Sequence, residues 1–584
     1  MNLKKFYEGN VFDAYEYFGA HLENGGVTFR TYAPNAERVT LFGDFTGWQE
    51  VSLEQYRKSG VWEVFLNYAY PGQRYKYVIY GNKGRVEHCD PYGFGMEMRP
   101  GNCSVIRDLN EYQFSDGAWM RKRTRCYDKP LNIYEMHLGS WKRNWGKWFS
   151  YSEIADTLIH YLKENGYNYV EFMPLSEHPF DGSWGYQNTG YFAPTSRYGT
   201  ISQLKYLIDR LHQNGIGAIL DFVPVHFAVD KFGLKEYDGT ALYEYPGKKG
   251  RSEWGSFNFN HGRGEVRSFL QAAANFWLKE LHFDGIRMDA VSRLIFWKGD
   301  YNQGENQDGI SFLKNFNAGI RRLHPKAILI AEDSTIYPGM TTPVDQGGMG
   351  FDYKWDLGWI YDTFHYMGKN VKERGSIPDK ISFSFYYGRN ERYILELSHD
   401  EVGRGHKSII EKLNGTYEEK FAQLRLLYML MMMHPGKKLN FMGNEIAMFR
   451  EWDENREADW NLLSFPMHSG FQKYMQELNS IYLKEKAMWE LDHEDNGFYW
   501  LDCKSKNPCV FGFVRQSSKG KLAVFLNFSD KKAQIDPSIW GEVKMILNSD
   551  WNIWGGETKK VQRRAIQKTI APYSGVVYKI KEEH

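Results

Sequence analysis

The chain has 584 residues, a formal net charge of +1 and an aromatic content of 17%, against 25% charged residues. A net charge near zero gives no electrostatic reason to expect nucleic acid or an anionic membrane as a partner. The aromatic surplus favours a sugar partner, because the apolar C–H faces of sugars stack on rings, although large cores account for many of these rings. The five cysteines form neither a CxxC pair nor a dense framework, which argues against zinc and against a disulfide scaffold.

Residues 25–108 predict a β-sandwich. Four runs of strand-like residues are separated by turns: VTFRTYAP, RVTLFGDF, VWEVFLNY and RYKYVIYG. We place the first domain at residues 1–115, with a polar, aromatic linker over about 109–130. Trp48 and the strand aromatics have two interpretations, a sugar-binding platform or an apolar seam that docks the sandwich on the next domain. We favour docking.

From Asn132 onward, strand-like runs alternate with helical ones. NIYEMHL, YVEFMPL and GAILDFV precede helices that we expect near residues 152–165, 201–214 and 265–281. The series continues with GIRMDAV, AILIAED, a shorter FDYKWD, YILELSH and LNFMGNE. Eight such units predict an α/β fold, a central (β/α)8 TIM barrel, which we place at residues 116–485.

The β pattern returns after about Lys486, in GFYWLD, VFGFVRQ, LAVFLNFS and VVYKIK. It predicts an all-β C-terminal domain, a small β-sandwich, over residues 486–584. Within the barrel, the roughly 35 residues between Phe227 and Arg263 are long for a loop. Loops of that size are usually functional and often cover a substrate.

Neither a signal peptide nor a membrane span is predicted. The first 20 residues lack a continuous apolar region, and the longest apolar run, LLYMLMMM at 426–433, is far shorter than the ~20 residues that cross a bilayer. We therefore expect a cytoplasmic protein with reduced thiols.

Three carboxylates, Asp289, Glu332 and Asp400, each follow a short apolar run, in the strings GIRMDAV, ILIAEDS and LELSHDEV. The carboxyl ends of barrel strands form the face that holds the active site. Breaking a glycosidic bond with retained configuration needs an ionised carboxylate that attacks the anomeric carbon and a protonated one that supplies the leaving oxygen with a proton, roughly 5 Å apart. Any one of the three alone is more simply a helix cap or loop acceptor, but together they favour glycoside chemistry.

Arg287 lies two residues before Asp289, and residues i and i+2 of a strand face the same side. Its guanidinium can therefore reach Asp289 and keep it ionised, because a positive charge lowers a carboxyl pKa and a like charge raises it. Asp221 and His226 belong to DFVPVH, which follows the apolar run GIGAIL in the same way. The pattern thus predicts four strand ends that contribute polar groups to one site.

These four strings resemble the signature regions of the α-amylase superfamily, and nearly the whole chain resembles the 1,4-α-glucan branching enzymes within it. YAPNAERVTLFGDFTGW at 32–48 is similar to that family's carbohydrate-binding module. The most specific string is EFMPLSEHPFDGSWGYQNTGYFAPTSRYG at 171–199, because general amylases do not share its HPFDGSWGYQ core. Further similar strings are YEMHLGSW at 134–141, SHDEV at 398–402, HPGKKLNFMGNE at 434–445 and EWDENREADWNLL at 451–463.

The resemblance implies a role for each carboxylate. Asp289 corresponds to the nucleophile, Glu332 to the general acid/base, and Asp400 to the third carboxylate, which binds and distorts the reacting sugar. Among the implied substrate-binding residues, His226, Arg287 and His399 hold that sugar and the catalytic carboxylates, and Tyr186 stacks under the sugar. Asp221 orients the site through hydrogen bonds. For Gln187 and Glu445, glucan contact and packing are equally good interpretations.

The implied activity is that of a branching transferase. Asp289 would attack an α-1,4-linked glucose while Glu332 protonates the departing chain, and Glu332 would then activate a 6-hydroxyl of another glucan chain, which forms an α-1,6 branch. A hydrolase of the same superfamily, debranching or trehalose-releasing, would use the same carboxylates on water. A non-catalytic glucan-binding protein typically lacks one or more of the carboxylates, and this chain has all three.

Some positions depart from the pattern that the resemblance implies. Asp333 follows Glu332 where a second glutamate is usual, Val225 replaces a small residue, and GRGHKS follows Val402. The contacts that these three positions would make to an acceptor chain are therefore not predicted. The resemblance implies no cofactor and no metal, and no calcium-type loop is present. The expected partner is an α-1,4-glucan (glycogen, amylose or amylopectin), with no nucleic acid and no membrane, and the chain is expected to be a monomer or a weak oligomer.

Overall fold

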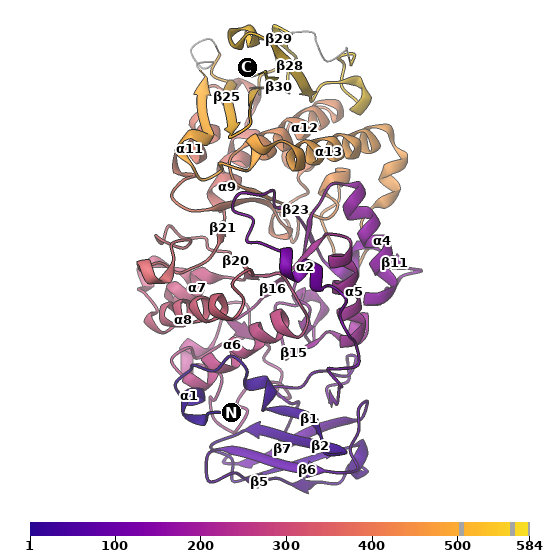
Figure 1. The fold of residues 1–584 in the computed structure, drawn as a ribbon, viewed down its shortest axis with the longest axis vertical. Coiled ribbons are helices and arrows are strands. Elements are labelled where there is room, and N and C mark those ends of the chain that lie inside the picture. Colours follow the sequence, from indigo (N-terminus) through magenta and orange to yellow (C-terminus); the bar gives the residue numbers. More distant parts are fainter. Residues whose placement is uncertain (502–506, 561–566, 582–584) are drawn as a thin grey trace. The chain divides into compact units, whose positions relative to one another are not determined.

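A computed structural model describes residues 1–501, 507–560 and 567–581 of the chain (Figure 1). The chain divides into two compact units. The first comprises residues 1–124, 137–159 and 171–352, and the second comprises residues 125–136, 160–170 and 353–584.

Two antiparallel sheets form the N-terminal part of the first unit, which confirms the predicted sandwich (Figure 1). One sheet has the order β1-β2-β6-β5 and the other β4-β3-β7-β8. Their bounds are β1 Gly19–Glu23, β2 Gly26–Tyr32, β3 Arg38–Gly43, β4 Val51–Ser52, β5 Glu54–Gln55, β6 Val61–Leu66, β7 Arg74–Gly81 and β8 Gly84–His88. Apolar side chains such as Val27, Phe29 and Leu41 are fully buried and form the core between these sheets.

The sandwich docks through polar contacts rather than through Trp48. Thr31 and Tyr237 share a buried hydrogen bond of 2.7 Å, and the Tyr32 hydroxyl donates to Glu265 in the helix α6 (Gly264–Lys279) at 2.9 Å. Trp48 is 38% exposed and packs edge to face on Phe42 of the same sandwich. The apolar docking seam that we favoured for Trp48 is therefore wrong for this residue, which lies outside these contacts.

Eight strands close into the predicted barrel, in the order β10-β13-β16-β19-β20-β21-β22-β23. Every residue of β16 and β19 is buried, as expected for parallel strands that are covered on both faces. The strand bounds are β10 Asn132–Met136, β13 Tyr169–Phe172, β16 Gly217–Phe222, β19 Gly285–Met288, β20 Ile328–Ala331, β21 Tyr353–Trp355, β22 Tyr393–Leu397 and β23 Lys437–Phe441. The predicted strands thus all form; they begin within two residues of the expected runs and end up to four residues before them.

The predicted helices follow these strands. They include α4 Tyr151–Glu164, α5 Ile201–Gln213, α6, α8 Gln307–Leu323, α9 Leu357–Met367, α12 Tyr417–Met433 and α13 Pro466–Lys484. The apolar run at 426–433 lies in α12 and is buried on all sides, because α12 packs between the barrel half of the second unit and the C-terminal strands. None of the helices in the described ranges has the length and apolarity that crossing a bilayer requires.

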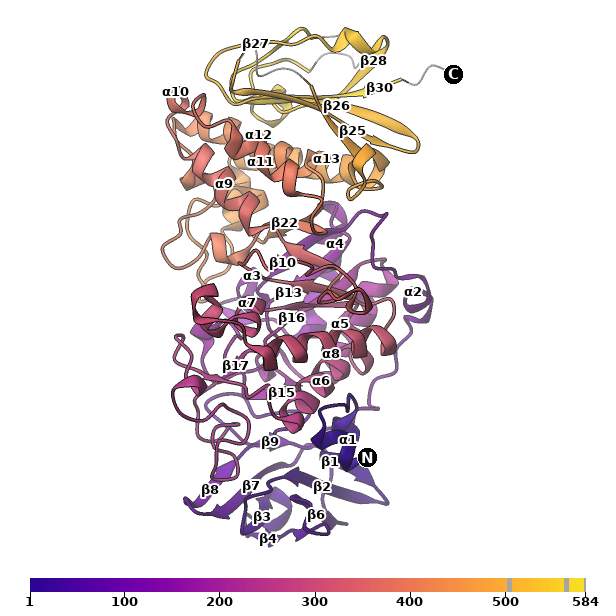
Figure 2. The same cartoon turned by 90° about the vertical axis from the view of Figure 1, so that its left-hand side faces the viewer.

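The second unit ends in the predicted all-β domain, in which a sheet of order β24-β25-β26-β30-β28 faces the pair β27-β29. Figure 2 shows α12 and α13 beside this sheet, and α12 contacts β26 and β30. The strand bounds are β24 Phe498–Leu501, β25 Val510–Ser517, β26 Gly520–Asn527, β27 Ala533–Gln534, β28 Val543–Asn548, β29 Thr569–Ile570 and β30 Ser574–Ile580.

A buried ion network links this sheet to a barrel strand. Asp492 accepts from Lys437 of β23 at 3.1 Å and from Arg515 of β25 at 2.6 Å, and all three side chains are at most 1% exposed. Burial alone would raise the pKa of Asp492, but the charges of Lys437 and Arg515 outweigh it and lower the pKa. Asp492 therefore compensates two cations that have no access to water.

Asp492→Asn is expected to destabilise the protein by about 3–5 kcal/mol, because it leaves buried cations uncompensated. The folded-state pKa of Asp492 is lowered, so its contribution is present above the unfolded pKa of about 3.9 and is lost as the pH falls below it. Thermal unfolding at pH 7 and at pH 3 should show a large difference between wild type and variant that shrinks in acid.

Asp495→Asn is the matched control. Asp495 pairs with Arg389 at 2.7 Å, but its side chain is 92% exposed, and exposed pairs contribute little. Equal melting temperatures for the two variants would contradict the role of the buried network.

Candidate active site

The site in the first unit is built around the buried guanidinium of Arg287. Arg287 lies on β19, and its Nη1 donates to both oxygens of Asp221 and to Oδ1 of Asp289, each at 2.8 Å. Burial alone would lower the pKa of Arg287, but Asp221, Tyr186, Asp289 and Glu332 raise it well above its usual value. The guanidinium is therefore a permanent positive charge inside a cluster of acids, and the predicted contact with Asp289 is present.

Glu332 comes directly after β20 and lies beside the same guanidinium, with its Oε2 3.8 Å from Nη2 of Arg287. Its Oε2 also accepts a hydrogen bond of 2.6 Å from the backbone N–H of Ala290. Ala290 has a left-handed conformation (φ 48°), which a residue with a β-carbon adopts at a cost. The left-handed conformation of Ala290 thus costs free energy, but it directs the Ala290 backbone N–H toward the carboxylate of Glu332.

Asp221 and Tyr186 complete the buried side of this cluster. Asp221 ends the run of β16 and is nearly inaccessible, with its side chain 1% exposed. The Tyr186 hydroxyl donates to Asp221 Oδ2 at 2.5 Å. Asp221 is therefore held by hydrogen bonds on the buried side of the cluster, while the side chains of Asp289 and Glu332 retain 14% and 16% exposure.

His226 and Gln187 both contact Trp254, a residue that the strand-end pattern does not reveal. The rings of His226 and Trp254 have centroids 4.9 Å apart, and Gln187 Nε2 donates to the Trp254 carbonyl at 3.0 Å. Burial lowers the pKa of His226 to about 4, so its imidazole is neutral at pH 7. Among the described residues, His226 Nδ1 is buried and has no hydrogen-bond partner. A buried polar atom of this kind is costly unless a ligand or water pairs with it.

The second unit contains His399 and Asp400, in the turn after β22. The carboxylate of Glu135, on β10, accepts hydrogen bonds from the His399 backbone N–H at 2.9 Å and from its ring Nδ1. Because a carboxylate only accepts, this contact assigns the proton to Nδ1 and directs Nε2 toward Asp400, 3.4 Å away. Asp400 is the accessible member, with its side chain 56% exposed, whereas His399 is 3% exposed.

Glu445 has a different environment. It is fully buried in the second unit, and its Oε1 accepts from Tyr134 at 2.8 Å and from Tyr161 at 2.5 Å. Burial raises its pKa. This geometry supports packing rather than contact with a glucan for Glu445.

Glu135 and Trp254 were not identified from the sequence as site residues. Glu135 is a carboxylate in a fully buried strand, and its charge there is a signal that could have identified it. Trp254 lies in the long 227–263 loop, where its type and position resemble those of many surface residues, so only the fold shows its contact with His226.

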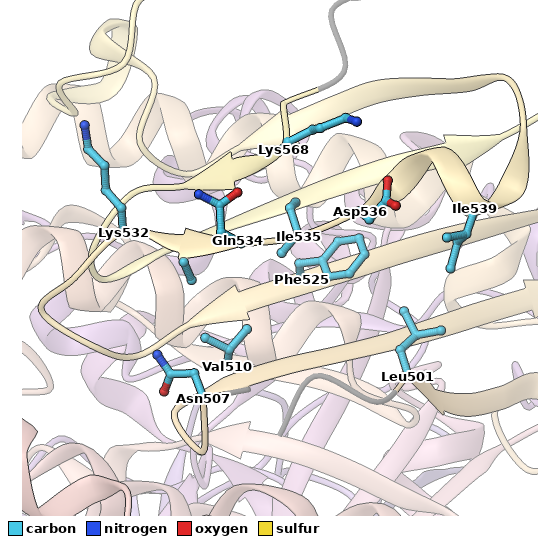
Figure 3. A pocket seen from close by; sticks show the side chains of 11 residues that line it. Leu501, Asn507, Val510, Phe525, Lys532, Gln534, Ile535, Asp536, Ile539 and Lys568 are labelled. Carbon is cyan, nitrogen blue, oxygen red and sulfur yellow. The ribbon is translucent and has the colours of Figure 1, made fainter. Parts of the chain in front are cut away.

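A cavity of about 740 Å³ lies in the C-terminal domain (Figure 3). Leu501, Val510 and Phe525 line it from the large sheet, with Lys532 and Lys568 beside β27 and β29. Asp536 is its single carboxylate, so it lacks the pair that glycoside chemistry requires. Within the described ranges, no group of three or more His, Cys, Asp or Glu side chains could hold a metal ion.

Three family models match parts of the chain. They are carbohydrate-binding module 48 (isoamylase N-terminal domain) over residues 17–93, the alpha amylase catalytic domain over residues 142–239, and the alpha amylase C-terminal all-beta domain over residues 500–581.

Similar proteins cover almost the entire chain. The 1,4-alpha-glucan branching enzyme GlgB of Geobacillus stearothermophilus is 42% identical over 598 residues, which cover 100% of this chain and 93% of that protein. The GlgB of Aquifex aeolicus (strain VF5) is 42% identical over 615 residues, which cover 98% and 97%.

Two solved structures share the fold. A putative alpha amylase from Salmonella typhimurium has a TM-score of 0.75 at 18% identity and covers 97% of this chain and 100% of its own. A pullulanase complexed with maltotetraose, from Anoxybacillus sp. LM18-11, has a TM-score of 0.75 at 18% identity and covers 99% and 89%. At this identity the likeness concerns the fold alone.

Proposed function

The chain belongs to the 1,4-α-glucan branching enzymes of the α-amylase superfamily, and from this membership we propose which residues perform its reaction. It is a glycosyltransferase that cleaves α-1,4-glucosidic bonds and transfers the released chain to a 6-hydroxyl, which forms an α-1,6 branch. The proposed catalytic residues are Asp289, Glu332 and Asp400. The observation that carries the proposal is the single guanidinium, Arg287, that contacts both Asp289 and Glu332.

In the first step, a carboxylate oxygen of Asp289 forms a bond to the anomeric carbon, and the bond from that carbon to the leaving oxygen breaks. Glu332 gives its proton to the leaving oxygen, so the remainder of the chain departs with a neutral hydroxyl. Arg287 lies closer to Asp289 (2.8 Å) than to Glu332 (3.8 Å), and its charge therefore stabilises an ionised Asp289 more strongly than an ionised Glu332.

In the second step, Glu332 accepts the proton of the incoming 6-hydroxyl. The oxygen of that hydroxyl attacks the anomeric carbon, and the bond from this carbon to Asp289 breaks. The two displacements restore the original configuration at that carbon. The carboxylates act in the same way on water, and transfer requires that a second chain reaches the intermediate first. The whole-chain similarity to branching enzymes favours transfer over hydrolysis.

His399 and Asp400, which follow β22 in the second unit, are proposed as further residues of the same reaction, as the similarity of SHDEV at 398–402 to the family's motif implies. Asp400 would bind the hydroxyls of the reacting sugar, and His399, held by Glu135, would position it. His226 would donate or accept through its neutral ring, and Tyr186 would stack under the sugar.

Further features of the chain also remain proposals. We propose domains at 1–115, 116–485 and 486–584, supported by the three family matches. A cytoplasmic location is supported by Cys89, Cys103, Cys126 and Cys509, which are buried and outside any disulfide, whereas Cys503 lies outside the described residues. We also propose a monomer or weak oligomer, which sedimentation of the pure chain would test.

Proton NMR of amylose incubated with the pure protein tests the function. We expect new α-1,6 anomeric signals without a matching rise in reducing ends, because each cleaved chain is transferred rather than released. Heat-denatured protein serves as the control. A rise in reducing ends without new branches would mean that the carboxylates act on water, and the chain would then be a hydrolase.

A further inference from the structure

We propose that Trp254 is a glucan-binding platform beside the catalytic cluster, where an α-1,4-linked glucan chain stacks on the exposed indole next to His226. This inference rests on the proposed function, since it concerns a chain that the same site cleaves. A glucan platform would give the long 227–263 loop a function, since the proposed chemical steps do not involve this loop.

The exposure of Trp254 is unusual within its loop. Tyr237, Tyr243 and Phe259 of the loop are between 0% and 4% exposed, and Phe232 and Phe257 are half-buried, whereas Trp254 is 43% exposed. Leaving an indole in water forgoes the free energy that its burial would contribute. An exposed ring beside an active site therefore marks a surface for an apolar ligand face.

Trp254 is held firmly in this exposed position. Its backbone N–H donates to Ser252 Oγ at 3.1 Å, and its backbone carbonyl accepts from Gln187 Nε2 at 3.0 Å. The guanidinium carbon of Arg293, on α7 (Val291–Ile295), lies 5.0 Å from the ring centroid, and Arg293 in turn pairs with Glu253 at 2.5 Å. A ring fixed from several directions loses little freedom on binding, which favours affinity.

The neighbouring polar atom points to the same ligand. His226 lies 4.9 Å from Trp254, and its buried Nδ1 has no partner among the described residues. Burial keeps the imidazole neutral by lowering its pKa to about 4, so the ring can pair with a hydroxyl in either direction. An apolar surface next to one unsatisfied polar atom matches a sugar, which presents C–H groups and hydroxyls together.

A small cavity that Trp254 helps to line does not offer an alternative site. A cavity of about 30 Å³ is bounded by Trp254, Arg293 and Trp297. It can hold about one water molecule but not a glucose unit. The ligand must therefore use the exposed surface of Trp254, next to the sugar unit that His226 would hold.

Trp254→Ala and Trp254→Phe test the proposal, with Trp145→Ala as the matched control. Trp145 is 98% exposed, in the turn between β11 (Arg143–Asn144) and β12 (Lys147–Trp148) of the same unit. We expect Trp254→Ala to raise the KM for amylose about tenfold, equivalent to about 1.4 kcal/mol, and to change kcat less than about twofold. Trp254→Phe, which keeps a ring, should raise KM about threefold or less, and Trp145→Ala should leave both constants unchanged.

Binding is measured separately by calorimetry with maltoheptaose, in proteins that also carry Asp289→Asn so that no turnover occurs. The dissociation constant should rise by the same factor as KM when Trp254→Ala is added. An unchanged dissociation constant, or a lowered melting temperature with unchanged affinity, would overturn the proposal and assign Trp254 a structural role. Calorimetry gives this answer even if the NMR assay detects no branching, so failures of the two proposals are distinguishable.

Discussion

Asp289→Asn is expected to lower the branching rate by about 10⁴-fold or more, while the affinity for maltoheptaose changes less than about threefold. The amide is close in shape to the carboxylate but cannot form the bond to the anomeric carbon, so the covalent intermediate is lost. The fold around it should persist, because Arg287 retains two hydrogen bonds to Asp221. NMR of amylose reactions stopped at set times measures the branching rate, and calorimetry measures the affinity for maltoheptaose.

Asp345→Asn is a suitable control for this substitution, since it makes the same chemical change at an exposed carboxylate of the same unit. It should have wild-type rate and affinity. Retained turnover in Asp289→Asn, or lost affinity together with retained turnover, would contradict the assignment of Asp289 as nucleophile.

Glu332→Gln is expected to lower the rate on amylose by about 10²–10⁴-fold, the range typical of a lost general acid or base. The effect should depend on the leaving group. An α-maltosyl fluoride donor releases fluoride, which departs without a proton, so formation of the glycosyl-enzyme should be nearly normal with this donor. Transfer from the intermediate should remain slow, because no base is present to activate the acceptor hydroxyl.

The glycosyl-enzyme of Glu332→Gln should therefore accumulate with the fluoride donor and appear in intact-protein mass spectrometry as an added maltosyl group. Asp289→Asn provides the matched comparison, because it should show no adduct with either donor. If Glu332→Gln were equally slow with both donors and formed no adduct, Glu332 would have no role in proton transfer.

Much of the fold could be predicted because its signals are local. Each barrel strand is a short apolar run followed by helical periodicity, and these signals depend on neighbours within about ten residues. The strand-end positions of Asp289, Glu332 and Asp400 were predicted for the same reason. The contact of Arg287 with Asp289 follows from the two-residue period of a strand and is present at 2.8 Å.

Other features depend on residues far apart in the chain, and only the tertiary structure decided them. Glu135 and His399 are 264 residues apart, and no local pattern indicates that one holds the other. Gln187 and Trp254 are 67 residues apart, and the bonds from Tyr134 and Tyr161 to Glu445, which favour packing for Glu445, join residues 311 and 284 positions apart. The sequence by itself determined the strands, the helices and the carboxylates at the strand ends, because these follow from local periodicity and from motifs. The structure decided which side chains are buried, paired or open to a ligand, because those properties depend on the packing of distant segments.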